Sequence, residues 1–214
     1  MARRTLILTT VTATAALLLT ACGGGGSGKT DDIKGADKGA QSPSPSATTA
    51  TGGPDVSVPK DLNLVFDFAQ PSDAKQAAAL ADAENYVRAL KHGIAKQDPN
   101  DPAYQYYSGG QAAQYAKSQI QAWVKGGWAP TGTDKYYDSK VTTMTGGKRV
   151  LVSFCRNQAK FYGKEIKTGK VLYTKESLSS YEKFSLLMFP PSGSSHAWKA
   201  QVAEVAGKAK ECQS

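Results

Sequence analysis

Histidine and cysteine are scarce in this chain, whose 214 residues include two histidines and three cysteines. No Cys-x-x-Cys or His-x-x-x-His pair occurs, so the close ligand spacing typical of zinc sites is missing. No glycine run leads into a predicted helix through Gly-Lys-Ser or Gly-Lys-Thr, as a phosphate-binding loop does. No Gly-x-Ser-x-Gly elbow follows a predicted strand, which argues against a serine hydrolase. We therefore expect no metal site and no cofactor.

The chain also lacks an apolar run long enough to span a membrane. The apolar stretch at residues 5–19 is interrupted by five threonines and is shorter than the roughly 20 residues that a spanning helix needs. Arg3 and Arg4 precede this stretch, and the small residues Thr20 and Ala21 follow it. A charged start, a short apolar middle and small residues, in that order, predict a secretory leader. The paired arginines leave the general and the twin-arginine export routes both open.

The end of this leader resembles the lipobox of bacterial lipoproteins. Leu19, Thr20, Ala21 and Cys22 supply an apolar residue, two small residues and a cysteine. The resemblance implies cleavage between Ala21 and Cys22 and a diacylglycerol, carrying acyl chains such as palmitate, on the Cys22 sulfur. Two acyl chains hold a protein stably, so we expect a lipid anchor on the extracytoplasmic face of the cell membrane. A plain secretory leader with an incidental cysteine is the alternative.

Three segments follow from this interpretation: a signal peptide at residues 1–21, a tether at 22–59 and a domain at 60–214. The tether is rich in glycine, serine, threonine and proline and shows no apolar periodicity, so we expect it to be disordered. A random coil of about 37 residues holds its ends about 30–35 Å apart on average. The remaining residues have the mixed composition and the length of one globular domain with a single core.

The first half of the domain predicts helices. Residues 74–96 carry apolar side chains at spacings of three and four, with Asp82, Lys91 and His92 assigned to the solvent side. Ser72 and Asp73 are available as N-terminal caps, and prolines follow the helix. A short aromatic segment, residues 104–107, comes next. Ser108 and Gln111 resemble a capping box for a second helix that stops at Gly126 and Gly127.

The second half predicts strands. Residues 140–144 and 149–157 flank a Thr-Gly-Gly-Lys turn, which indicates a hairpin because glycine accepts the backbone angles of such turns. Residues 172–174 and 180–189 are interpreted as one long strand, bulged in the middle, and residues 197–205 as the last. Helices followed by an antiparallel meander predict an α+β domain with its helices packed on one curved sheet.

Cys155 and Cys212 remain as a pair once Cys22 is assigned to lipid. In an oxidising compartment we expect them to form a disulfide, which closes a loop of about 58 residues and stabilises the fold by roughly 4 kcal/mol. The alternative is a reactive thiol at Cys155, which needs a nearby base. His92 and His196 are the only histidines, and neither is placed for that role.

The helices, the meander and the cysteine placement together resemble the NTF2-like superfamily, in which a cone of helices packs on a bent sheet. In particular they resemble small lipoproteins of high-GC Gram-positive bacteria that carry one such domain. The segments that carry the resemblance are residues 83–87, 107–112, 150–155, 168–171 and 198–200, with Cys212. The superfamily includes isomerases, dehydratases, transport factors and accessory domains of cell-wall proteins, so the resemblance implies a fold and leaves the activity open.

An enzyme of this fold needs a carboxylate in apolar surroundings that faces a polarising hydroxyl. Glu176 or Glu182 paired with Tyr173 or Tyr181 would meet this need, as in a small-molecule isomerase or lyase. The alternative is that strand alternation places these charged side chains on the solvent-exposed face. Five other aromatic residues either line a pocket mouth or pack in the core: Tyr104, Tyr106, Tyr107, Trp123 and Trp128.

Charge is distributed unevenly along the domain. Residues 60–134 contain 7 basic and 8 acidic side chains, whereas residues 135–214 contain 14 and 6. An outward sheet face rich in cations would attract an anionic envelope polymer, lipid headgroups or an acidic protein; alternatively, the lysines only keep the strands soluble. The candidate anion-binding residues are Lys148, Arg149, Arg156, Lys160, Lys164, Lys167, Lys170 and Lys175.

These observations favour a non-enzymatic binding or scaffolding module, tethered to the membrane, for an envelope ligand or an envelope protein. Nucleic acid is not expected outside the cell. The competing hypothesis is the isomerase or lyase described above.

Overall fold

A computed structural model of the chain describes residues 52–213. The leader, the cleavage site at Ala21 and Cys22, and the tether up to residue 51 lie outside these residues, so the expectations for them stay predictions. None of the helices within the described range combines the length and the apolar character that crossing a membrane requires.

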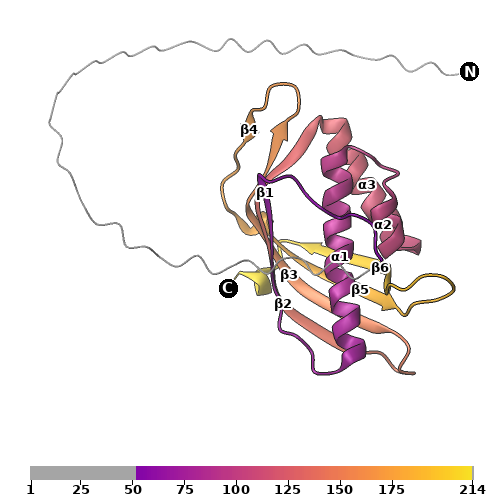
Figure 1. The fold of residues 1–214 in the computed structure, drawn as a ribbon. Helices are drawn as coiled ribbons and strands as arrows, with labels where there is room; N and C mark the ends of the chain where they lie inside the picture. Colours follow the sequence, from indigo (N-terminus) through magenta and orange to yellow (C-terminus); the bar gives the residue numbers. More distant parts are fainter. Residues whose placement is uncertain (1–51, 214) are drawn as a thin grey trace, which may run out of the picture. The chain divides into compact units, whose positions relative to one another are not determined.

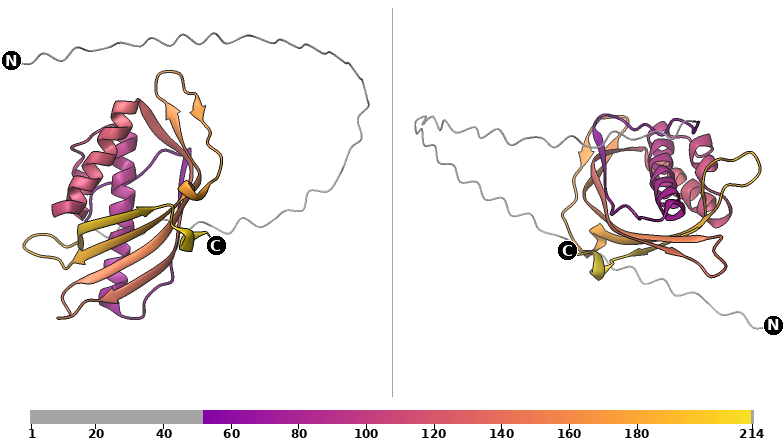
Figure 2. Two further views of the ribbon diagram at one scale, coloured as in Figure 1. Left: turned by 180° about the vertical axis from the view of Figure 1, so that it is seen from behind. Right: turned by 60° about the horizontal axis from the view of Figure 1, so that its bottom comes forward.

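The described residues form one mixed structure of helices and strands (Figure 1). In chain order the elements are β1 (Leu62–Asp67), α1 (Ala74–Lys96), α2 (Pro102–Tyr107), α3 (Gly110–Gly126), β2 (Trp128–Thr143), β3 (Val150–Glu165), β4 (Val171–Leu172), η1 (Leu178–Ser180), β5 (Tyr181–Phe189), β6 (Lys199–Gly207) and η2 (Lys210–Cys212). The strands form a six-stranded sheet in the order β1-β2-β3-β5-β6, with β4 paired to β3. The sheet curves, and the helices lie in its hollow (Figure 2). This arrangement is compatible with the predicted α+β class.

Helix α1 has the bounds that its periodicity predicts. The Asp73 carboxylate caps its start by accepting a 2.9 Å hydrogen bond from the backbone N–H of Gln76. Its apolar face packs on the sheet and includes Leu80, Val87 and Ile94, all of which are buried. The helix therefore anchors the core against the concave face of the sheet.

The capping box predicted for the next helix is wrong. Gly109, rather than Ser108, is the N-cap of α3, and no side chain caps it. The Ser108 hydroxyl instead donates to the Tyr104 carbonyl at 2.6 Å, within the preceding turn of α2. The Gln111 side chain accepts from the backbone N–H of Ala203 at 2.6 Å and so ties α3 to β6. A tertiary contact thus takes the place of the local motif.

The hairpin of β2 and β3 is present, but its strands are far longer than predicted, with 16 residues each. Gly132 marks a bend in β2: its φ is +90°, and a Cβ there would come within 2.1 Å of the Lys160 carbonyl oxygen. A register shift follows near Asp138, which has a φ of 52°. Such irregularities bend a strand, and they account for the curvature of the sheet.

Two further expectations about the strands are corrected. The single long strand predicted across residues 172–189 is two strands, because β4 pairs with the end of β3 at Gly163 and β5 pairs with its start. Strand β1 is absent from the sequence-based prediction and runs parallel to β2. Just before it, Val56 and Val58 already pack against the core, within the segment assigned to the tether.

Candidate functional site

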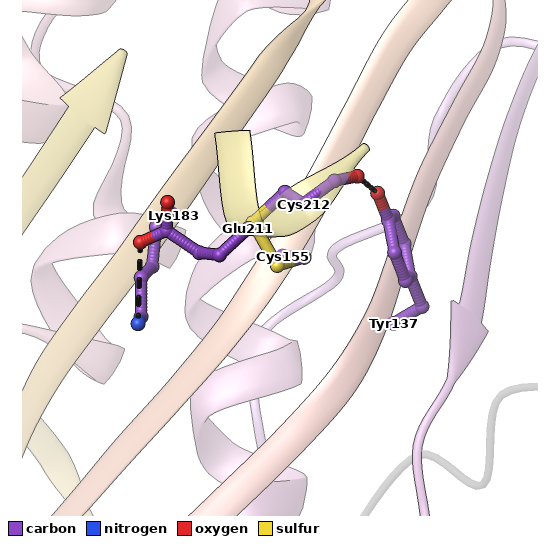
Figure 3. Close-up of a disulfide and its surroundings, with 5 residues drawn as sticks. All are labelled: Tyr137, Cys155, Lys183, Glu211 and Cys212. Atoms are coloured by element: carbon purple, nitrogen blue, oxygen red, sulfur yellow. Dashed lines mark hydrogen bonds and ion pairs between the residues drawn. A yellow bond between two sulfur atoms is a disulfide. The ribbon is translucent and has the colours of Figure 1, made fainter. Parts of the chain in front are cut away.

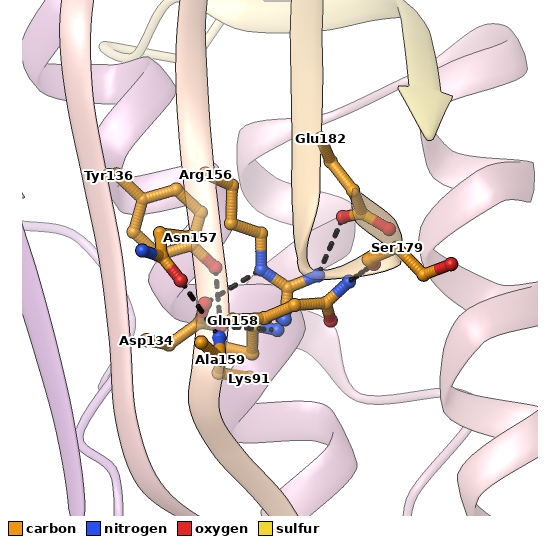
Figure 4. Close-up of polar contacts among 9 residues, drawn as sticks. All are labelled: Lys91, Asp134, Tyr136, Arg156, Asn157, Gln158, Ala159, Ser179 and Glu182. Atoms are coloured by element: carbon orange, nitrogen blue, oxygen red, sulfur yellow. Dashed lines mark hydrogen bonds and ion pairs between the residues drawn. The ribbon is translucent and has the colours of Figure 1, made fainter. Parts of the chain in front are cut away.

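Four charged side chains meet between α1 and the sheet and form what we call the ion cluster: Lys91 of α1, Asp134 of β2, Arg156 of β3 and Glu182 of β5 (Figure 4). Arg156 binds both oxygens of Asp134, at 2.7 and 2.9 Å, and donates to Glu182 at 2.8 Å. Lys91 reaches Asp134 at 2.9 Å. With two charges of each sign, the cluster is electrically neutral.

Burial and the neighbouring charges shift the pKa values of the residues in this cluster. Burial raises the pKa of Asp134, but the charges of Arg156 and Lys91 outweigh it and hold that pKa below its usual value. Burial and the neighbouring Arg156 lower the pKa of Lys91 to about 8, against the attraction of Asp134. The Tyr136 hydroxyl donates to Asp134 at 2.8 Å. Burial raises the pKa of Tyr136 well above its usual value. Asp134 is therefore an ionised structural partner whose hydrogen-bonding capacity is largely used.

Burial overturns four expectations. The sequence predicts Arg156 on the outward basic face, and Asp82, Lys91 and His92 on the solvent side of α1; all four are buried. Asp82 accepts a 2.8 Å hydrogen bond from the backbone N–H of Trp198. His92 contacts the Ser57 carbonyl through Nδ1 at 2.6 Å and Asp101 through Nε2 at 3.5 Å. Each has an ionic or hydrogen-bonding partner that compensates for its loss of water.

A small cavity of about 110 Å³, the inner chamber, adjoins the ion cluster. It is lined from α1, α3 and the sheet, and Arg156, Glu182 and Tyr115 contribute polar atoms. The Tyr115 hydroxyl has no hydrogen-bond partner among the described residues, and burial together with the charge of Glu182 raises its pKa to about 12. Tyr115 is therefore a neutral donor that remains available to a bound molecule.

A larger hollow of about 480 Å³, the aromatic groove, opens beside the inner chamber. Its lining residues are Trp123, Trp128, Gln158, Phe161, Tyr162, Gly163, Leu172, Thr174, Lys175, Ser177, Ser179 and Ser180. Trp123, Gln158 and Phe161 line both hollows, so these side chains form the wall between them. The volume of the groove lies in the range of small-molecule sites, about 300–1,000 Å³.

The predicted basic cluster is divided among three places. Five of its lysines, which we call the hairpin lysines, lie on the end of β3, on the turn to β4 and just after β4. This hairpin projects at the top of Figure 1. The five are Lys160, Lys164, Lys167, Lys170 and Lys175. Lys175 lines the aromatic groove, and Lys164 pairs with Asp61. Lys148 and Arg149 are exposed at the opposite end of the β2–β3 pair. Arg156 is the buried member discussed above.

The four residues considered for proton transfer do not form a shared buried site. Tyr181 donates to Glu176, but Glu176 is exposed to solvent. Glu182 is taken by Arg156, and Tyr173 is 77% exposed. The requirement of such chemistry, a carboxylate in apolar surroundings facing a hydroxyl, is not met by these pairs.

The five aromatic residues that sequence reasoning leaves open separate into two groups. Trp123 and Trp128 line the groove, whereas Tyr104 and Tyr107 are buried in the core and Tyr106 packs against it. Sequence reasoning does not identify Lys91, Asp134, Gln158 or Tyr162 as site residues. One signal is available for Lys91, since it lies four residues after buried Val87 and thus on the same helix face.

Cys155 and Cys212 form a disulfide that fastens η2 to β3 (Figure 3). Tyr137 supports this end by donating to the Cys212 carbonyl, and Glu211 pairs with Lys183 at 3.4 Å. Within residues 52–213 no group of three or more histidine, cysteine, aspartate or glutamate side chains is placed to hold a metal ion.

No protein-family model and no curated protein matches this chain. Among solved structures, Aln2 from a Streptomyces species is 11% identical, with a TM-score of 0.43 over 65% of this chain and 94% of that one. The intermembrane space region of chloroplast protein ARC6 is 13% identical, with a TM-score of 0.36 over 64% of this chain and 98% of that one.

Proposed function

We propose that this chain is a lipid-anchored extracytoplasmic protein whose domain binds an anionic ligand of the cell envelope at the aromatic groove. Lipidation of Cys22 and removal of residues 1–21 belong to this proposal and are supported by the lipobox-like sequence. A disulfide between Cys155 and Cys212 is consistent with an oxidising compartment. The finer fold assignment, an NTF2-like cone, is likewise proposed, and helices seated in the hollow of a bent sheet support it.

One observation carries the binding role: the hairpin lysines lie on the segments that build the aromatic groove. Residues 160–176 contain five lysines and two glutamates, so this end of the sheet is positively charged. Apart from Lys164, none of the five has an ion pair among the described residues. Unpaired cations beside a hollow attract an anionic ligand and leave its uncharged parts within reach of the groove.

The ion cluster has a different role in this proposal. Its cations already bind Asp134 and Glu182, so they are not available to an incoming anion without breaking those pairs. We assign the cluster to fixing the position of β2, β3 and β5 behind the groove.

Two matched double variants test the binding role, because both remove two exposed cations from the same sheet. They are Lys167→Gln with Lys170→Gln at the groove end and Lys148→Gln with Arg149→Gln at the far end. The mature-length chain with Cys22→Ala is titrated with purified anionic wall polymer at low and moderate salt. We expect the groove-end variant to bind about 2- to 30-fold more weakly, from roughly 0.2–1 kcal/mol per exposed charge contact.

The far-end variant should bind like the parent chain, and binding should weaken as salt rises. Equal losses in the two variants would show that only net charge matters, and absence of binding by the parent would overturn the proposed ligand class. Circular dichroism of both variants provides the folding control.

A further inference from the structure

Trp128 lines the aromatic groove and is packed against the protein on one side while remaining partly exposed. It is 40% exposed, although its ring lies directly on the backbone of Gly126. A Cβ on Gly126 would come within 2.5–2.7 Å of three atoms of the indole, so only glycine permits this position. Trp123 meets the ring edge-on, with centroids 6.4 Å apart. The indole is therefore held in place while a large part of it faces solvent.

Other residues that line the groove supply polar atoms without a hydrogen-bond partner among the described residues. Gln158 donates through its amide nitrogen to the Ser179 carbonyl at 3.2 Å, and its amide oxygen has no partner among the described residues (Figure 4). Thr174 and Ser179 also line the groove, and neither hydroxyl bonds to another side chain in the described range. The groove thus combines a supported aromatic surface with uncharged hydrogen-bonding groups.

We propose that the aromatic groove binds one or two sugar rings of a glycan, with the apolar face of a ring stacked on Trp128. A pyranose ring has C–H groups on its faces and hydroxyls around its rim, so it needs an aromatic surface and hydrogen-bonding groups side by side. The inference rests on the proposed function and names the part of the ligand that enters the groove. The hairpin lysines then contact anionic groups outside it.

Other ligand classes fit this lining less well. An acyl chain needs a continuous apolar wall, but half of the lining residues are polar, and Leu172 is the one aliphatic side chain among them. An extended peptide bound as an added strand needs an open sheet edge of useful length, whereas the edge strand at the groove, β4, has only two residues. A proline-rich peptide remains as an outcome of the test.

The sugar rings of two envelope polymers share this chemistry, so the experiment uses separate probes. The mature-length chain with Cys22→Ala is titrated with a neutral tetramer of β-1,4-linked N-acetylglucosamine, with sugar-bearing anionic wall polymer, and with sugar-free polyphosphate. Tryptophan fluorescence and calorimetry report binding. If the tetramer binds more tightly than the wall polymer, the ligand is a neutral glycan strand. If the wall polymer binds more tightly than both the tetramer and polyphosphate, the groove binds the sugars of that polymer.

Two variants and one control locate the interaction. Trp128→Ala removes the stacking surface, and Gly126→Ala displaces the indole while replacing glycine with a better helix former at the end of α3. Ile166→Ala removes an exposed apolar side chain from the turn between β3 and β4, outside the groove lining. We expect about tenfold weaker saccharide binding in the first two variants and no change in the third.

The outcomes separate this inference from the proposed function. Equal affinity for polyphosphate and for the wall polymer, unaffected by Trp128→Ala and without binding of the neutral tetramer, would overturn the sugar inference and leave anion binding intact. Displacement of saccharide by a proline-rich peptide at lower concentration would assign the groove to peptides instead. Failure of every probe to bind the parent chain would reject both.

Discussion

At the scale of single residues, the ion cluster is the most consequential feature of the core. Asp134 has no exposed surface, and Arg156 binds it through two nitrogens. Desolvating such a pair is costly, so it adds less to stability than its short distances suggest. Removing one partner, however, leaves the other charged and buried. The cluster therefore fixes how β2, β3 and β5 are placed relative to α1.

Replacing Arg156 with methionine tests this role. Because Asp134 would keep its charge with only Lys91 beside it, we expect the free energy of unfolding to fall by roughly 3–5 kcal/mol. The matched change Lys148→Met removes an exposed cation and should alter it by less than about 0.5 kcal/mol. Urea unfolding followed by tryptophan fluorescence measures both, and Arg156→Lys serves if the methionine variant does not fold. Equal, small losses would contradict a structural role for the cluster.

The low pKa of Asp134 gives stability a defined pH dependence. Because its folded pKa lies below the unfolded value of 3.8, Asp134 stabilises the fold fully above about pH 4, and this contribution is lost as pH falls through the folded pKa. The gap in unfolding free energy between the parent and Asp134→Asn should therefore narrow as pH falls below about 4. A carboxyl NMR titration of the parent measures the same pKa directly, and a midpoint above 4 would refute the prediction.

The alternation of residues in β3 indicates that position 156 is buried, although the charge of Arg156 suggests an exposed position. Val150, Val152 and Phe154 alternate onto the buried face of β3, and position 156 continues that alternation. The partner that makes burial possible, Asp134, lies 22 residues earlier on another strand. Periodicity can therefore identify the buried position, but only the paired strand shows why a charge is tolerated there.

At the scale of elements, the sequence predicts helices better than strands. The bounds of α1 follow from its own periodicity and its Asp73 cap, which are local properties. Strand β1 has six residues and pairs with residues 132–137, about 70 positions later. The split between β4 and β5 likewise depends on where each meets β3. Such long-range pairing is not encoded in a local pattern.

The disulfide acts at this scale, since it joins η2 to β3 across a sequence separation of 57. Replacing both cysteines, Cys155→Ala with Cys212→Ala, should lower the free energy of unfolding by about 4 kcal/mol, because the unfolded chain regains the freedom of a long loop. Denaturant unfolding of the variant, compared with the oxidised parent, checks this value, and the reduced parent should unfold like the variant. A loss below about 1 kcal/mol, or two free thiols in the purified parent, would contradict it.

At the scale of the whole molecule, the two ends of the long β2–β3 pair differ. One end carries the hairpin lysines and the aromatic groove, and the other carries the turn with Lys148 and Arg149. The sequence predicts a basic second half but not this division, nor the groove, whose lining comes from α3, β2, β3, β4 and the segment between β4 and β5. Composition gives the amount of charge, whereas the fold decides which charges share a surface.

The proposal as a whole depends on where the mature chain begins and what it carries. Intact-mass spectrometry of the protein from membranes of its native host measures both together. We expect a chain that begins at Cys22, with a mass increase for a diacylglycerol and its acyl chains and a decrease for one disulfide. An unmodified chain that still contains residues 1–21, recovered from the soluble fraction, would contradict the account.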